Sequence, residues 1–111
     1  MNHRPPHPGD YIRVLYLPDF ISSQKDNNKK GNVTELAKAM RIGRVTLSRL
    51  LNCNAGVSVP MAFRLAKLFN KSAAFWLTKQ IEYDLWAFKN KKRKSKNTWS
   101  KEELLKLAEI E

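Results

Sequence analysis

The chain has 111 residues, of which 42% are hydrophobic and 10% aromatic, and it carries 21 Lys and Arg against 10 Asp and Glu. This length suits one small core, and no apolar stretch approaches the ~20 residues that a membrane helix needs. The single cysteine, Cys53, excludes an internal disulfide and a cysteine-rich zinc site. We therefore expect a cytoplasmic protein of one domain and a tail, with no membrane partner and with Cys53 as a bystander thiol.

The formal net charge of +11 is divided unevenly along the chain. Residues 1–88 contribute +7, the run KNKKRKSKN at 89–97 contributes +6, and residues 98–111 contribute −2. A basic protein attracts polyanions because each phosphate that it neutralises releases a condensed counterion. Charge alone does not distinguish DNA from RNA or an anionic membrane surface. The lysine run is either a solvated linker or a nonspecific phosphate contact.

The pattern of apolar residues predicts helices and no convincing strand pair. A first helix is expected over residues 10–17, before Pro18, which cannot continue it. The polar segment Ser22–Gly31 has no periodicity and predicts a mobile loop. The lysines of this loop either lie on a harmless surface or meet backbone phosphate. The N-terminal histidines, His3 and His7, lie in a segment that we expect to be flexible.

Two short helices follow, with only three residues between them. Asn32 and Glu35 have the spacing of a capping box, which predicts a helix over 33–40. Gly43 is then the expected N-cap of a second helix over 44–51. At about 100° per residue, one face of the second helix is apolar, with Leu47, Leu50 and Leu51. The opposite face carries Arg44, Val45, Ser48, Arg49 and Asn52.

Three more helices are predicted toward the C-terminus. Ser58 is the expected N-cap of a fourth helix, with Pro60 in its first turn, and a fifth helix runs over 72–88. The fifth helix has two apolar faces, and either the rest of the chain buries both or one is a dimer or partner interface. The predicted interface residues are Phe75, Trp76, Tyr83 and Trp86. Ser100 and Glu103 repeat the capping signature before a short amphipathic helix that is marginal in isolation.

Two helices joined by a three-residue turn, the second with a polar outer face, describe a helix-turn-helix, whose second helix enters the major groove of DNA. Free N–H groups at the starts of the two helices, near Asn32 and Gly43, suit phosphate. Arginine can donate two hydrogen bonds to a guanine edge, and hydroxyl and amide groups can bond a base or a phosphate. The outer face offers these groups in Arg44, Thr46, Ser48, Arg49 and Asn52. The alternative is that the arginines only solubilise a helical hairpin.

The string TELAKAMRIGRVTLSRLLN, followed by GVSVPMAFRLAKLFNKSAAFWL and IEYDLW, resembles the HigA-type antitoxins of the Xre (Cro/C1-type) helix-turn-helix group, which includes VapI-like virulence-associated proteins. The opening HPGDYIR is similar to the family's HPGEYL start, and the resemblance covers about residues 7–88. It implies an all-α fold: a five-helix, lambda-repressor-like DNA-binding domain at 1–88 with its motif at 32–52. The residue pattern adds a basic linker at 89–97 and a short helical tail at 98–111.

The resemblance implies a homodimeric antitoxin that binds double-stranded operator DNA, represses its own operon and neutralises a HigB-type, mRNA-cleaving toxin. A stand-alone Xre-type regulator without a toxin is the alternative. The predicted DNA-binding set is Asn32, Arg41, Gly43, Arg44, Val45, Thr46, Ser48, Arg49 and Asn52. Because toxins of this type are usually basic, the toxin contact would be largely apolar or use acidic side chains such as Asp10, Asp19, Glu102, Glu103, Glu109 and Glu111.

Four positions depart from the family pattern. Val33 and Val45 stand where glutamine is usual, Arg41 replaces the glycine of the turn, and Gly43 replaces the N-cap serine. Without the glutamines the amide readout of adenine is lost, and Val45 can instead contact a thymine methyl group. Arg41 raises a question of backbone strain and adds a cation facing phosphate.

No group of residues predicts catalysis, a metal site or a cofactor. His3 and His7 have no ligand cluster near them, and Glu82 and Asp84 point about 200° apart on one helix, unlike an acid and a base that face one substrate. The sequence holds no Gly-rich phosphate loop and no activated nucleophile. An RNA-binding or RNA-cleaving role is disfavoured, because no strand platform with stacked aromatic residues is predicted. We expect a protein that is not an enzyme.

Overall fold

A computed structural model describes residues 4–18, 29–90 and 99–109, with the side chains of 29–32 left out of the description. The elements in chain order are α1 (Pro8–Tyr11), the π-helical turn η1 (Ile12–Tyr16), α3 (Lys29–Met40), α4 (Arg44–Leu51), α5 (Val59–Leu68), α6 (Ala73–Asn90) and α7 (Lys101–Glu109). The described residues contain no strand, so the prediction of an all-α fold is confirmed. None of their helices has the length and apolarity that crossing a bilayer requires.

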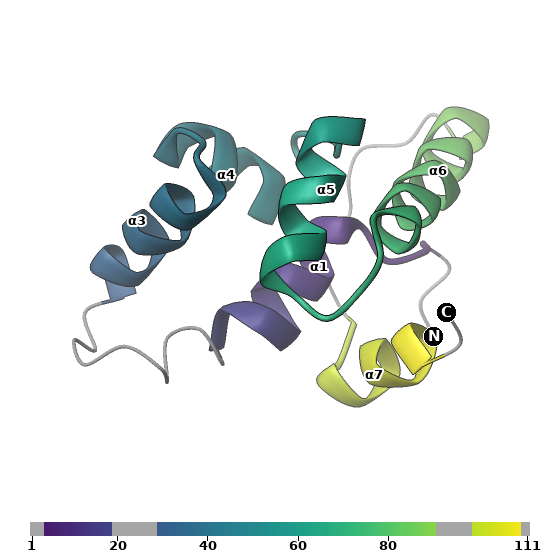
Figure 1. The fold of residues 1–111 in the computed structure, drawn as a ribbon. Coiled ribbons are helices and arrows are strands. Elements are labelled where there is room, and N and C mark those ends of the chain that lie inside the picture. Colours follow the sequence, from purple (N-terminus) through teal and green to yellow (C-terminus); the bar gives the residue numbers. More distant parts are fainter. Residues whose placement is uncertain (1–3, 19–28, 91–98, 110–111) are drawn as a thin grey trace.

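The helices surround α1 and η1, which lie at the centre of the molecule (Figure 1). The pair α3 and α4 forms one end, α5 and α6 pack along each other, and α7 closes the bottom against η1. One continuous core results, and Trp76 is its largest fully buried side chain. Tyr11 and Phe75 pack edge-on against Trp76, with ring centroids 6.3 and 5.1 Å away. The core therefore joins the first helix directly to α6.

The N-terminal segment is ordered from Arg4, so the expectation that His7 lies in a flexible tail is wrong. His7 is 1% exposed and is the N-cap of α1. Its Nδ1 accepts a hydrogen bond from the Gly9 N–H at 2.9 Å, and the Asp10 carboxylate accepts from the His7 N–H at 2.8 Å. Pro8 fits the first turn because its missing N–H has no intrahelical partner there. The first helix is confirmed, starting at Pro8. His3 lies outside the described residues.

Helix α3 begins at Lys29, four residues before the expected start. Asn32 therefore lies within the helix and not at its N-cap, where the sequence places it. Glu35 instead accepts from the Lys38 ammonium at 3.5 Å. Gly31 and Asn32 are weak helix formers, which is why the sequence places the start too late, but tertiary packing outweighs such preferences. The end of the predicted loop, from Lys29, is thus helical, and its earlier residues lie outside the described ones.

The turn between α3 and α4 closes with a Schellman motif. The Ile42 N–H donates to the Ala37 carbonyl and the Arg41 N–H to the Lys38 carbonyl, both at 3.0 Å. This geometry places the residue after the helix in the left-handed region, where Arg41 has φ 59°. The strain anticipated for an arginine in place of glycine is therefore present. Gly43 is the N-cap of α4, as predicted.

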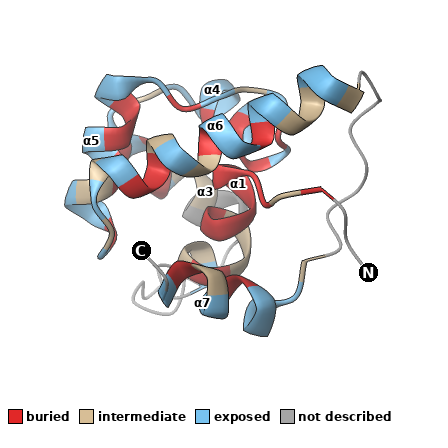
Figure 2. Cartoon of the chain, turned by 90° about the vertical axis from the view of Figure 1, so that its right-hand side faces the viewer, coloured by how far each residue is buried: buried red, intermediate tan, exposed pale blue. Residues whose placement is uncertain are grey.

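The later caps follow the sequence closely. The Met61 N–H donates to Ser58 Oγ at 3.3 Å, which confirms Ser58 as the N-cap of α5. Ser100 and Glu103 form the predicted capping box, with bonds of 2.9 and 3.1 Å. Helix α7 buries its apolar side against the body of the molecule, as its inward red face shows (Figure 2). A helix that would be marginal alone is thus packed onto the core.

Helix α6 buries only one of its two apolar faces. Phe75, Trp76 and Tyr83 are 3%, 0% and 4% exposed and belong to the interior of this chain. The prediction that these three form a dimer or partner interface is wrong, because α1 and α5 already cover them. Trp86 is half-buried beside Tyr83. The uncovered apolar stripe is the opposite one, with Ile81 57%, Leu85 67% and Phe88 79% exposed.

Candidate nucleic-acid interface

Helix α4 is short and packs into the core by its apolar side. Leu47, Leu50 and Leu51 are 0%, 1% and 8% exposed and enter the common core. The rest of its surface faces outward, and the predicted contact residues on it are all exposed: Arg44, Val45, Thr46, Ser48 and Arg49, with Asn52 just after the helix. The Asn52 amide nitrogen donates to the Ser48 carbonyl at 3.0 Å, so it caps the helix and leaves its oxygen as an acceptor.

The two arginines of α4 are available to an external acceptor. Within the described part of the chain, neither the Arg44 nor the Arg49 guanidinium has an ion-pair partner. Each guanidinium presents a planar set of donors that matches the two acceptors on a guanine edge or the oxygens of a phosphate. Val45 is 68% exposed beside them. This face therefore combines two planar donors with one apolar contact.

More cations lie beside the turn that precedes α4. A hollow of about 410 Å³ opens there between the end of α3 and α5, lined by Ala39, Met40, Arg41, Arg64, Lys67 and Leu68. Arg41 is one of the contacts predicted from the sequence, whereas Arg64 and Lys67 are not among them. Their spacing of three residues on α5 was the available signal, because it places both on one exposed side of a helix. Cations thus line a hollow that joins the turn before α4 to α5.

The chain is 34% identical to the HTH-type transcriptional regulator YbaQ of Escherichia coli K12, over 81% of this chain and 72% of that protein. It is 33% identical to the antitoxin HigA-1 of Vibrio cholerae, over 79% of this chain and 74% of that protein. The chain belongs to the HigA family of helix-turn-helix antitoxins and regulators. No protein-family model matches it.

Two solved structures carry the same arrangement of helices as this HigA-family chain. The antitoxin GraA aligns with a TM-score of 0.66 and 27% identity, over 81% of this chain and 87% of that one. The Pseudomonas aeruginosa antitoxin HigA, solved with the higBA promoter, aligns with a TM-score of 0.61 and 29% identity, over 86% of this chain and 100% of that one. The HigA-family resemblance and the lambda-repressor-like fold that it implied are thereby confirmed.

Gly43 and Asn32 are the remaining predicted contacts of this HigA-family chain. Gly43 is exposed at the start of α4, where its backbone is free to approach a phosphate. The first turn of α3 begins at Lys29 and not near Asn32. The role of the Asn32 side chain stays a prediction. Among the described residues, no cluster of three or more His, Cys, Asp and Glu is placed to hold a metal ion.

The loop after α4 is held to α6 by one amide side chain. Gln80 is 7% exposed; its Oε1 accepts from the Val57 N–H and its Nε2 donates to Asp84, both at 2.9 Å. A Cβ added at Gly56 would lie 3.2 Å from Gln80, so the loop passes close over it. Gln80 of α6 therefore holds the loop that follows α4, which limits how far the end of α4 can move.

Proposed function

We propose that this chain is the antitoxin of a HigBA-like toxin-antitoxin module, which binds its own operator through α4 and neutralises a HigB-type, mRNA-cleaving toxin. The observation that carries the DNA-binding part is the outer face of α4. Its two arginines have no acidic partner within the described residues, while three buried leucines fix the helix beneath them. A formal charge of +11 supplies the general attraction to phosphate that precedes base reading.

The operator would be read by a homodimer. A two-fold operator requires two recognition helices about 34 Å apart, which one copy of α4 cannot supply. The uncovered stripe of α6, Ile81, Leu85 and Phe88, offers the contact because contiguous exposed apolar surface is typical of interfaces. The occupant we infer is a second copy of this chain. A two-fold contact pairs a patch with itself, which suits a stripe that is apolar along its length.

Toxin binding is supported by the family and has to use other surface. Asp10, one of the acidic side chains considered for the toxin contact, is 0% exposed and is excluded from any contact with a partner. Glu102, Glu103 and Glu109 of α7 are exposed and remain available. A stand-alone regulator without a toxin is the second candidate function, since the E. coli relative is named only as a transcriptional regulator.

Two measurements test the proposal. Footprinting on the DNA upstream of the gene should reveal a protected palindrome with wild-type protein, and the Arg44→Ala, Arg49→Ala double variant should lose it. A Lys106→Ala variant, which removes an exposed cation from α7, is the matched control and should keep it. Co-expression with the product of the adjacent open reading frame should rescue growth and yield a complex. Protection without rescue favours the stand-alone regulator, and no protection contradicts operator binding.

A further inference from the structure

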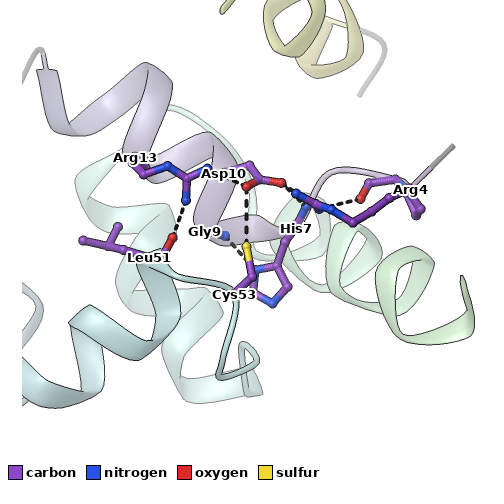
Figure 3. Close-up of polar contacts among 8 residues, drawn as sticks. Arg4, His7, Gly9, Asp10, Arg13, Leu51 and Cys53 are labelled. Atoms are coloured by element: carbon purple, nitrogen blue, oxygen red, sulfur yellow. Dashed lines mark hydrogen bonds and ion pairs between the residues drawn. The ribbon is translucent and has the colours of Figure 1, made fainter. Parts of the chain in front are cut away.

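A buried carboxylate joins the start of the chain to the end of α4 (Figure 3). Asp10 is 0% exposed, and its two oxygens have different partners. Its Oδ2 pairs with Arg4 Nη1 at 3.0 Å and accepts from the His7 N–H at 2.8 Å. Its Oδ1 pairs with Arg13 Nη2 at 2.7 Å and accepts from the Cys53 thiol at 3.4 Å. One carboxylate therefore ties together four groups from two parts of the chain.

The Asp10 carboxylate is charged when the protein is folded at neutral pH. Burial alone would raise its pKa, but hydrogen bonds from Arg4, the His7 amide and Arg13 outweigh burial and hold the pKa below the ordinary value of 3.8. Burial raises the pKa of the neighbouring Cys53 thiol to about 11, so this thiol is protonated and can donate to Asp10. Cys53 is thus a structural hydrogen-bond donor rather than a bystander.

The N-terminal segment contacts the last turn of α4 at two further points. The Arg13 guanidinium, oriented by Asp10, also donates from Nη1 to the Leu51 carbonyl. A Cβ at position 9 would lie 2.0 Å from the Leu50 carbonyl oxygen, so Gly9 lets the first helix pass directly against α4. The Leu51 carbonyl, one of the last four carbonyls that a helix leaves without an intrahelical partner, here accepts the bond from Arg13. Two residues of the HPGD sequence make this contact possible: Gly9 allows the close approach, and Asp10 orients Arg13.

Fixing one end of a short rod determines where its other end lies. Eight residues of α-helix span about 12 Å, so a tilt of ~5° at the Leu51 end displaces the Arg44 end by about 1 Å. Hydrogen bonds to base edges weaken steeply over such a displacement, whereas the attraction of a cation to phosphate changes little. A change in tilt would therefore affect base reading more than general DNA affinity.

We propose that Asp10 is a positioning residue for base reading: through Arg13 and Cys53 it sets the tilt of α4, and its loss lowers discrimination between operator and random DNA more than it lowers DNA affinity. This inference rests on the proposed operator binding. Arg4 offers a matched control within the same cluster. It pairs with Oδ2, whereas Arg13 and Cys53 contact Oδ1, so removing Arg4 weakens the cluster but leaves both contacts toward α4 in place.

The test compares Kd values for the operator and for a random duplex of equal length, at one salt concentration, for wild type, Arg13→Ala, Asp10→Asn and Arg4→Ala. Circular dichroism confirms that each variant is folded at the assay temperature. Arg13→Ala and Asp10→Asn should lower the operator-to-random affinity ratio about tenfold or more, with random-duplex affinity within about twofold of wild type. Arg4→Ala should keep the ratio within about twofold.

The outcomes separate this inference from the proposed function. A wild-type ratio near one contradicts operator binding itself. A clear wild-type ratio that folded Arg13→Ala retains overturns the positioning role, as does an equal loss of ratio in Arg4→Ala. Should Asp10→Asn fail to fold, Arg13→Ala decides, because Arg13 is 30% exposed and its truncation disturbs the core less. Backbone amide chemical shifts in α4 give a second readout and should move in Arg13→Ala but not in Arg4→Ala.

Discussion

Helices α4 and α6 are built alike but differ in what they leave uncovered. Each buries one apolar side in the common core and leaves its other side exposed to solvent. The exposed side of α4 carries two guanidinium groups and two hydroxyl groups, whereas that of α6 carries a stripe of three large apolar side chains. Amphipathic periodicity therefore explains the fold of both helices but does not distinguish their roles. The chemistry of the uncovered side does: donors suit base edges, and apolar area suits another protein chain.

The comparison is tested most strongly by placing charge on the stripe of α6. Leu85→Glu with Phe88→Glu should convert the proposed dimer to a monomer and lower operator affinity about 100-fold or more, because the second half-site no longer binds at high effective concentration. Both side chains are largely exposed in one copy, so the fold should persist. Sedimentation and binding assays measure the two effects. Glu82→Gln, on an exposed position of the same helix, is the control. A double variant that remains dimeric would show that the copies meet elsewhere.

A second prediction concerns the apolar residue on the polar side of α4. Val45 is 68% exposed, and we propose that it meets a thymine methyl group. Val45→Gln should shift the preference at that base pair from thymine toward adenine by about 1 to 3 kcal/mol, because glutamine pairs with the adenine edge. Selection from a randomised operator measures the change. Val45→Ala should weaken the preference without reversing it. An unchanged preference in both variants would mean that position 45 does not face a base.

The anchored end of α4 predicts a dependence of stability on pH. The pKa of Asp10 is lowered on folding, so its ionised form stabilises the native state above the ordinary pKa of 3.8. This contribution falls as the pH drops below that value and is lost once the pH passes below the depressed pKa of the folded state. Thermal unfolding between pH 7 and pH 3 should show a steeper loss for wild type than for Asp10→Asn. Parallel curves would show that Asp10 gains little from its partners.

Much of the fold could be predicted from local signals, and the errors share one cause. Gly43, Ser58 and Ser100 were identified as caps because their bonds reach only a few residues along the chain. Asn32 was misplaced because core contacts extend α3 beyond where local preference ends it. The outer face of α4 followed from periodicity alone.

The errors at the candidate sites arose from contacts between distant segments. Phe75 and Trp76 looked like an interface because a sequence does not reveal that α1 covers them. For the same reason the HPGD motif supported the family resemblance without disclosing its contact with α4: Asp10 and Cys53 are 43 residues apart. The burial of His7, whose ring packs edge-on against Tyr83 with ring centroids 4.7 Å apart, was hidden likewise. Periodicity identifies two faces of a helix, but only the fold shows which one remains free.

The smallest expected effect concerns Arg41, in the turn before α4. Its replacement should raise the stability of the fold while it weakens DNA binding. Arg41 has φ 59°, a conformation that costs a non-glycine residue about 1 kcal/mol or more, and glycine avoids that cost. Because glycine also gains entropy in the unfolded chain, Arg41→Gly should stabilise the protein by only about 0.5 to 1 kcal/mol. The same change removes one cation beside the hollow between the end of α3 and α5. If Arg41 meets phosphate, the slope of log affinity against log salt should fall by about one.

Arg41→Asn completes this test, because asparagine tolerates the left-handed region and, like glycine, carries no charge. Denaturant titration should rank the stabilities as glycine, then asparagine, then arginine, while both variants should show the same loss of salt dependence. A more stable variant that binds DNA less well would mean that the arginine is kept for its charge, against the preference of the backbone. If Arg41→Gly is instead less stable than wild type, the contacts of the Arg41 side chain at the hollow stabilise the protein by more than its left-handed backbone conformation destabilises it.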